Sequence, residues 1–283
     1  MKRLAPLSLT LFVSLVHGSL IYAQQRPLVT QDPETIGGGR VLVDGGVDFA
    51  HNQQYPASGL KGNLLRLPVI GLSVGLGSIV ELRIDGGLFD ALSISERHPA
   101  ALSSAVTATG DSTHDIEDTI IATKIRILSE AAGRPALGVR FATKVPTASV
   151  ESGLGLNTTD FHMSLLAGKT AESVRFVGNV GVAILGDPTS GTRQNDVITY
   201  GLSIARALTE SAEVVGEVNG RASVRSGEPF PGTESRSIFK FGGRYTRGSL
   251  RIDGAVYVGL TTLDPTIGVT AGFTYVFDAF TAP

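Results

Sequence analysis

After its first 23 residues, this 283-residue chain alternates apolar with polar or small residues in one segment after another. Successive side chains of a β-strand point to opposite faces, so a two-residue period predicts strands whose two faces meet different surroundings. In the segment 79–88, for example, Leu82 and Ile84 share one face and Arg83 lies on the other. Twelve such segments follow residue 39, and they predict an all-β chain of about 12 strands.

The connections between these segments alternate between short and long. Residues 77–78 and 168–171 are short connections, whereas 98–117 and 146–159 are long ones. Short turns at one rim, longer loops at the other and an even number of antiparallel strands are typical of transmembrane β-barrels. Backbone N–H and C=O groups in hydrocarbon must all be paired, so a sheet crosses a membrane only when it closes on itself. We therefore predict a closed antiparallel transmembrane β-barrel over residues 40–283, with short periplasmic turns and longer extracellular loops.

Other classes of protein fit the sequence less well. A soluble β-sandwich would show the same alternation, but it gives less reason for short and long connections to sort by rim. The absence of Cys excludes a disulfide scaffold and a cysteine nucleophile. The near balance of 24 basic and 26 acidic residues, without a basic stripe, argues against nucleic acid as a partner.

The N-terminus predicts export. A basic start at Lys2 and Arg3, a mostly apolar stretch and a small residue at Ala23 indicate a secretory signal peptide over residues 1–23, with an uncleaved anchor as the alternative. No later apolar stretch is long enough for a membrane helix. We therefore expect a periplasmic lead over residues 24–39 and an outer-membrane location.

The polar face of the barrel strands should line the lumen. Ten of the fifteen charged residues on that face are basic, so an open lumen should favour anions. The alternative is that these groups pair across strands and fill the interior. The predicted lumen and solute-binding residues are Glu81, Arg83, Asp85, Lys124, Arg126, Arg140, Lys144, Arg175, Glu213, Glu217, Arg221, Lys240, Arg244, Arg251 and Asp253.

An enzyme has to be considered because His162 and Ser164 share one face of a strand and Asn179 lies on the next. A hydroxyl needs a neighbouring base to become a nucleophile, and outer-membrane phospholipases use a similar His-x-Ser arrangement. However, Phe161 and Met163 form the expected lipid-facing set, which turns His162 and Ser164 away from a lipid substrate. A hydrogen-bonded histidine in a polar lumen is the simpler interpretation.

The acidic residues around His114 in the 98–117 loop do not have the spacing of a calcium-binding loop. The glycines at 37–39 lack the Lys-Ser/Thr of a phosphate-binding loop and precede a strand. We therefore predict solvated loop charges, a flexible lead, and neither a metal site nor a cofactor.

Two segments resemble known outer-membrane proteins. Residues 151–161 (ESGLGLNTTDF), after a strand ending in Val145-Pro146, resemble the Gly-rich stretch that follows such an end in bacterial outer-membrane barrels of the transporter family labelled meta-pathway of phenol degradation. Residues 274–280 resemble the aromatic-alternating last strand that the barrel-assembly machinery recognises, although residues 281–283 follow where a terminal Phe is typical. The resemblance implies passage of small, hydrophobic molecules, with outer-membrane lipid, the assembly machinery and a small solute as partners.

The sequence therefore predicts an outer-membrane channel or transporter for passive or gated uptake of small anionic or hydrophobic and aromatic molecules, and no enzyme. The long loops 98–117 and 146–159 should partly cover its mouth. The alternatives are an outer-membrane esterase or phospholipase using His162 and Ser164, a structural surface barrel, and a secreted soluble β-protein.

Overall fold

The computed structural model describes residues 26–282, and these form strands, turns and irregular segments. No helix long and apolar enough to cross a membrane occurs among them. The predicted signal peptide lies outside the described residues. The strands are β1 (Arg40–Tyr55), β2 (Leu60–Gly75), β3 (Val80–Gly87), β4 (Asp90–Arg97), β5 (Ser112–Asp115), β6 (Thr119–Leu128), β7 (Ala136–Val145), β8 (Asp160–Ala171), β9 (Val174–Gly186), β10 (Gln194–Ala207), β11 (Ala212–Ser223), β12 (Arg236–Arg247), β13 (Leu250–Gly259) and β14 (Ile267–Asp278).

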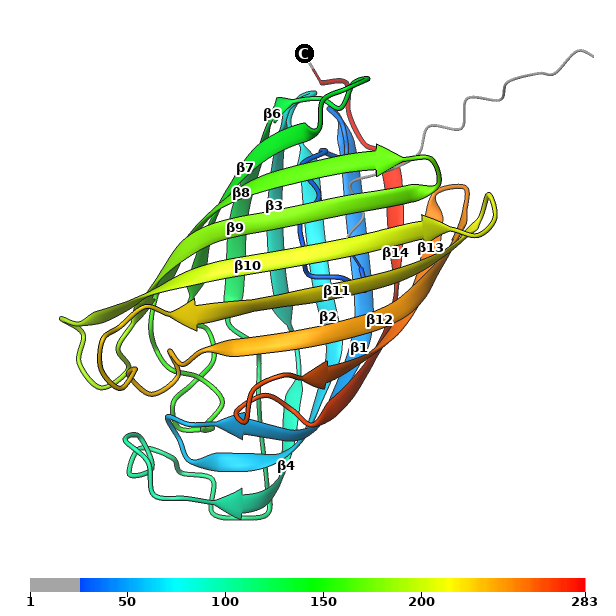
Figure 1. Ribbon diagram of the computed structural model, residues 1–283. Coiled ribbons are helices and arrows are strands. Elements are labelled where there is room, and N and C mark those ends of the chain that lie inside the picture. The colour runs from blue at the N-terminus through cyan, green and yellow to red at the C-terminus, as the bar shows by residue number, and fades with distance from the viewer. Residues whose placement is uncertain (1–25, 283) are drawn as a thin grey trace, which may run out of the picture.

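The strands form one antiparallel sheet that closes on itself. β1 pairs with β2 on one side and with β14 on the other, which completes the ring (Figure 1). Two strands of the wall are each divided in two, because β3 and β4 both pair with β2, while β6 pairs with β3 and β5 pairs with β4. The wall therefore has 12 strands, and the predicted fold class is confirmed.

The division of the third strand has a cause in the sequence of β2. Pro68 has no N–H to donate, so a regular ladder cannot continue past it. The wall opposite is interrupted at Leu88 and Phe89, between β3 and β4. Two backbone bonds bridge the interruption: Leu67 N donates to Phe89 O at 2.8 Å, and Leu88 N donates to Pro68 O at 3.1 Å. The sheet thus stays closed through the irregular point.

The structure corrects two predicted loops. Residues 90–97 are strand β4, and β5 occupies 112–115, so the predicted 98–117 loop is limited mainly to residues 98–111. The sequence also predicts a long loop over residues 53–62, but the strands of this first hairpin run on to Tyr55 and from Leu60. These extensions lie at the end of the barrel that carries the long loops (Figure 1).

The outer wall is apolar and the inner wall is polar along the same strands. In β12, Lys240 is 8% exposed between Phe239 at 42% and Phe241 at 55%. In a water-soluble sandwich such apolar side chains would be buried between two sheets, whereas here they cover the outside of a closed wall. Lipid tails are the surroundings that suit them. The side chains therefore face as the two-residue period predicts.

The clusters of buried apolar residues are small. The largest cluster contains Leu60, Leu64, Leu92 and Tyr257, near the end of the barrel with the long loops. Tyr257 also donates its hydroxyl to Asp48 Oδ1 at 2.9 Å. Elsewhere in the described residues the interior is filled mainly by polar groups. Hydrogen bonds and ion pairs, rather than an apolar core, therefore stabilise the interior of the barrel.

Candidate functional site in the barrel lumen

The fifteen charged residues predicted to face the lumen are all buried or half-buried in the structure. Glu217 in β11 is 2% exposed, while its neighbour Val218 is 36% exposed. Glu81 and Lys124 are 3% exposed on adjacent strands, and Lys124 Nζ lies 3.3 Å from Glu81 Oε2. The sequence thus places these side chains on the inner wall. Their role in binding a solute stays a prediction.

The residues before β1 lie inside the barrel, a placement that the sequence did not indicate (Figure 1). We call residues 26–39 the lead. The carboxylate of Glu217 accepts hydrogen bonds from Val29 N at 2.9 Å, from Thr30 N at 2.8 Å and from Thr30 Oγ1 at 2.8 Å. A carboxylate that receives several donors holds them strongly, because the bonds are charge-assisted. Glu217 is therefore an anchor for the lead.

Further along, the lead contributes carboxylates to arginines of the wall. Asp32 accepts two hydrogen bonds from Arg175, at 2.9 and 2.7 Å. Glu34 accepts one from Arg126 at 2.6 Å. Arg175 also contacts Glu130 in the turn between β6 and β7. Burial alone would raise the pKa of Glu130, but hydrogen bonds from Thr170 and the charge of Arg175 lower it, so this second carboxylate stays ionised.

The first residues of the lead face the opposite part of the wall. Arg26 lies 3.6 Å from Asp253 in β13. Lys240 donates to Pro27 O at 2.9 Å, and Arg244 donates to Arg26 O at 2.8 Å. Since later residues reach β9 and β6, the lead follows the inside of the wall and narrows the lumen. The sequence predicts that the lead lies on the periplasmic side of the membrane. Its place near the rim with the short turns agrees with that location, which stays a prediction.

Glycines of the inner wall make room for the lead. A Cβ atom at Gly201 would lie 2.8 Å from Thr30 Oγ1, and one at Gly138 would lie 3.4 Å from Pro33 Cβ. A Cβ at Gly46 would lie 2.3 Å from the guanidinium of Arg26. A Cβ at Gly201 would therefore press on the Thr30 hydroxyl and one at Gly46 on the Arg26 side chain, whereas one at Gly138 would only touch Pro33. The glycines of the inner wall thus leave space for a segment of the protein's own chain.

The predicted excess of positive charge is largely cancelled. Eight of the ten basic lumen residues have a carboxylate within 4.0 Å, and two of them use Asp32 and Glu34 of the lead. Several partners are acids that the sequence did not single out, such as Asp44, Asp118 and Asp160. Asp118 and Asp160 lie at strand ends, where the alternation is weakest. The two basic residues outside these pairs are Arg140 and Arg221.

The two exceptions differ from each other. Arg221 donates from Nε to Glu234 O and from NH2 to Gly232 O, both at 2.8 Å, so a long loop fixes its guanidinium. The side chain of Arg140 makes no hydrogen bond or ion pair with any part of the chain that the structure describes. Among the lumen cations, the positive charge most available to a solute is therefore that of Arg140.

The constellation considered for an esterase is not assembled. Asn179 Oδ1 accepts from Gln31 N at 2.6 Å, and Asn179 Nδ2 donates to Gln31 O at 2.8 Å, so the lead occupies this amide. Within residues 26–282, no hydrogen bond joins His162 to Ser164. Both side chains face inward, because Phe161 and Met163 beside them are 54% and 44% exposed on the outer wall.

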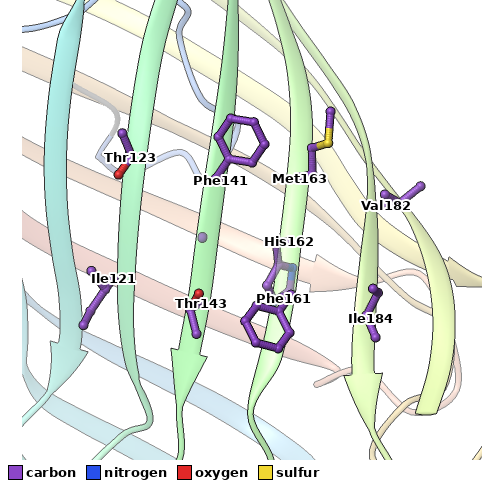
Figure 2. Close-up of a pocket in the computed structure, with 10 residues that line it drawn as sticks. Ile121, Thr123, Phe141, Thr143, Phe161, His162, Met163, Val182 and Ile184 are labelled. Atoms are coloured by element: carbon purple, nitrogen blue, oxygen red, sulfur yellow. The ribbon is translucent and has the colours of Figure 1, made fainter.

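A shallow hollow of about 350 Å³ lies on the outer wall over β6 to β9. Figure 2 shows Phe141, Phe161 and Met163 around it. Thr123 and Thr143 are two polar members of a mostly apolar lining. Most of its lining residues lie on the outer wall, and the inward residues Ala142 and His162 complete the lining.

The acidic residues around His114 have partners within the protein. Asp115 accepts from Ser149 N and Ser149 Oγ, at 2.8 and 2.7 Å. Asp118 lies 2.8 Å from Lys144 Nζ. In the described part of the chain, no three His, Asp or Glu side chains are placed together to hold a metal ion. These acids tie long loops to the rim of the barrel.

Several solved outer-membrane proteins share this fold. The COG4313 outer membrane channel from Pseudomonas putida F1 has a TM-score of 0.64 at 13% identity, over 87% of this chain and 98% of that chain. The translocator domain of autotransporter NalP from Neisseria meningitidis has a TM-score of 0.51 at 12% identity, over 84% and 88%. The NanC porin has a TM-score of 0.50 at 8% identity, over 83% and 98%. No curated protein matches the sequence.

The closed ladder and the apolar outer wall, together with this shared fold, confirm the predicted outer-membrane location. The sequence profile of the family described as "Putative MetA-pathway of phenol degradation" matches residues 25–277. The predicted resemblance is therefore confirmed, and the chain belongs to that family.

Proposed function

We propose that this protein is an outer-membrane channel for gated uptake of small molecules, and that the lead is its gate. The observation that carries the proposal is a closed wall, apolar outside and charged inside, whose interior is lined by a segment of its own chain. The shared fold with a solved outer membrane channel supports it. Side-chain charges in a narrow, low-dielectric passage set the barrier for a solute.

The lead is suited to gating because of how it is held. Its bonds to the wall run mostly to side chains such as Glu217, Asn179 and Arg175. A strand of the wall is held by a continuous ladder, whereas these contacts are separate and can be broken in a group without opening the barrel. Local opening of such a segment costs less than unfolding the sheet.

The solutes that we propose are small, and anionic or aromatic. The accessible positive charge at Arg140 supports the first class, and the phenol-degradation description of the family supports the second. We propose no enzymatic role, since His162 and Ser164 make no hydrogen bond to each other and face away from lipid. Outer-membrane lipid and the assembly machinery remain the proposed partners, and the outward aromatic residues Phe273, Tyr275 and Phe277 of β14 are the expected contact with that machinery.

Planar-bilayer recording tests the channel function. The purified full chain should give small, discrete current steps in KCl, because the lead narrows the lumen without removing all accessible polar groups. The same preparation should hydrolyse no phospholipid. A complete absence of current, in the wild type and in a variant whose lead has been released, would contradict transport and favour a structural barrel.

A further inference from the structure

Five inward-facing positions lie side by side across β7 to β11. Arg140 pairs with Ser164, Ser164 with Gly181, Gly181 with Thr199, and Thr199 with Arg221. We call these residues the Arg140–Arg221 row. Neighbouring strands are about 4.8 Å apart. The row therefore has an arginine at each end, and between them a glycine flanked by two hydroxyl groups. The two hydroxyls converge over the glycine, because a Cβ at Gly181 would lie 2.6 Å from Ser164 Oγ and 2.8 Å from Thr199 Oγ1.

The polar side chains of this row lie next to one another and lack partners. The side chains of Arg140, Ser164 and Thr199 make no hydrogen bond to other residues within 26–282, and neither does that of the neighbouring His162. Most charged groups of the wall are paired with each other or with the lead, as at Arg175 and Asp32, although some buried polar atoms, such as Asn219 Nδ2, also have no hydrogen-bond partner. The row differs from these atoms because its side chains are adjacent and only half-buried, so a ligand can reach several of them at once and supply the acceptor.

The row lies directly beside the lead, on the side of the long loops. On β7, the next inward residue from Arg140 toward the short turns is Gly138, which packs against Pro33. On β10, the next inward residue from Thr199 toward the short turns is Gly201, which packs against Thr30. A solute that enters from the long loops therefore meets the Arg140–Arg221 row before it meets the lead.

Burial changes at the row. Arg140, Ser164 and Thr199 are half-buried, so water reaches their side chains. Most inward residues on both sides of the row are buried: Gly138, Leu166 and Gly201 on the side of the lead, and Ala142, Ala183 and Val197 on the side of the long loops. His162, beside Ser164 on the side of the long loops, is half-buried. The row is therefore an accessible group of polar side chains among mostly buried neighbours.

Neighbouring charges do not neutralise the row. Glu81 and Asp85 are the carboxylates whose charges act on Arg140, but Glu81 is paired with Lys124 and Asp85 with Arg83. On the other side, His162 lies within electrostatic reach of both Arg140 and Arg221, which shows that the row's two arginines act on one region. Asp160, the acid that also acts on His162, is 3.1 Å from Lys144. Glu234 and Asp264 act on Arg221, and Asp264 also lies 3.8 Å from Arg236. The positive charge of the row that has no carboxylate of its own is therefore that of Arg140.

We propose that the Arg140–Arg221 row binds the carboxylate of a small organic monoacid. The free guanidinium of Arg140 presents a fork of N–H donors that matches the two oxygens of a carboxylate. The hydroxyls of Ser164 and Thr199 supply further donors over the open space at Gly181. One free guanidinium suits a single negative charge, because Arg221 already uses Nε and one NH2 on backbone carbonyls. This inference deepens the proposed channel function by naming the solute class that pauses beside the lead.

Equilibrium binding to the detergent-solubilised full chain tests the site without requiring any current. Titration calorimetry with benzoate should show saturable binding, and benzamide, its neutral analogue, should bind far more weakly. Arg140→Gln should weaken benzoate binding by about tenfold or more, because a charge-assisted bidentate contact is lost. Arg140→Lys should fall between the two, since lysine keeps the charge without the fork.

Arg206→Gln is the matched control, because it removes one positive charge from an exposed side chain of β10 and should leave benzoate binding unchanged. Equal binding by wild type and Arg140→Gln, or no benzoate binding at all, would overturn the site. Inorganic phosphate that displaces benzoate with equal or higher affinity would overturn the assignment to a carboxylate. Failure of the channel function would appear separately, as an absence of current in bilayers from a protein that still binds benzoate.

Discussion

Oxidation of the double variant Thr30→Cys/Gly201→Cys should fix the lead to the wall and stop uptake. A Cβ at Gly201 would lie 3.4 Å from Thr30 Cβ, close to the separation of about 3.5–4.5 Å found in disulfides. The chain has no Cys of its own, so the new pair has no competitor. Because uptake scales with the fraction of channels whose lead is released, the oxidised protein should lose about tenfold or more of its solute uptake.

Liposome swelling before and after reduction measures this effect within one preparation. Dithiothreitol should restore the uptake, and each single-cysteine variant should be insensitive to it. The Thr30→Cys control also accounts for the hydrogen bond that Thr30 Oγ1 donates to Glu217. Uptake that is the same in the oxidised and reduced double variant would show that solutes pass a fixed lead, and the gate would be wrong.

Glu217→Ala should release the lead. The carboxylate accepts hydrogen bonds from Val29 N, Thr30 N and Thr30 Oγ1, and each bond to a charged group contributes about 1.5–3 kcal/mol. The variant also leaves Lys240 in a buried position without the carboxylate 3.8 Å away. We therefore expect the free energy of docking of the lead to fall by about 3 kcal/mol or more.

The rate of maleimide labelling of Thr30→Cys reports this release, because Thr30 is 5% exposed when the lead is docked. Labelling should be about 100-fold faster in Glu217→Ala. Glu217→Gln, which keeps the shape and an acceptor oxygen, should give an intermediate rate. Equal labelling rates in all three backgrounds would mean that Glu217 does not hold the lead.

The alternation in the sequence predicts which way the wall side chains point, since a period of two has one physical consequence in a strand. Lys240 between Phe239 and Phe241 is an example in which residue types alone determine the inner and outer faces. The interruption at Leu88 and Phe89 was not predicted, because the effect of Pro68 acts on a partner strand and depends on the register.

The lead could not be predicted in the same way. Residues 26–39 have no periodicity, and Asp32 and Glu34 resemble ordinary solvated charges until their partners Arg175 and Arg126 are placed beside them. The one signal in the sequence is the glycine content of the wall, since the inward position of Gly201 leaves space that only another segment can fill.

The freedom of Arg140 is also a property of the assembled wall. It has the same parity as Lys124, its neighbour across β6 and β7, and the sequence does not distinguish them. The two residues differ in the neighbour on their other side. Lys124 of β6 lies opposite Glu81 of β3, whereas Arg140 of β7 lies opposite Ser164 of β8. Which charge stays free therefore depends on the cross-strand register.

Spin labels at two consecutive residues of β10 test most directly whether the wall separates lipid from a water-accessible interior. Ile198 is 43% exposed on the outer face, and Thr199 is half-buried on the inner face. In lipid vesicles, a label on Ile198→Cys should collide with dissolved oxygen and be shielded from a water-soluble nickel chelate, and a label on Thr199→Cys should show the reverse. The same accessibility at both positions would contradict a membrane-spanning barrel with an aqueous lumen.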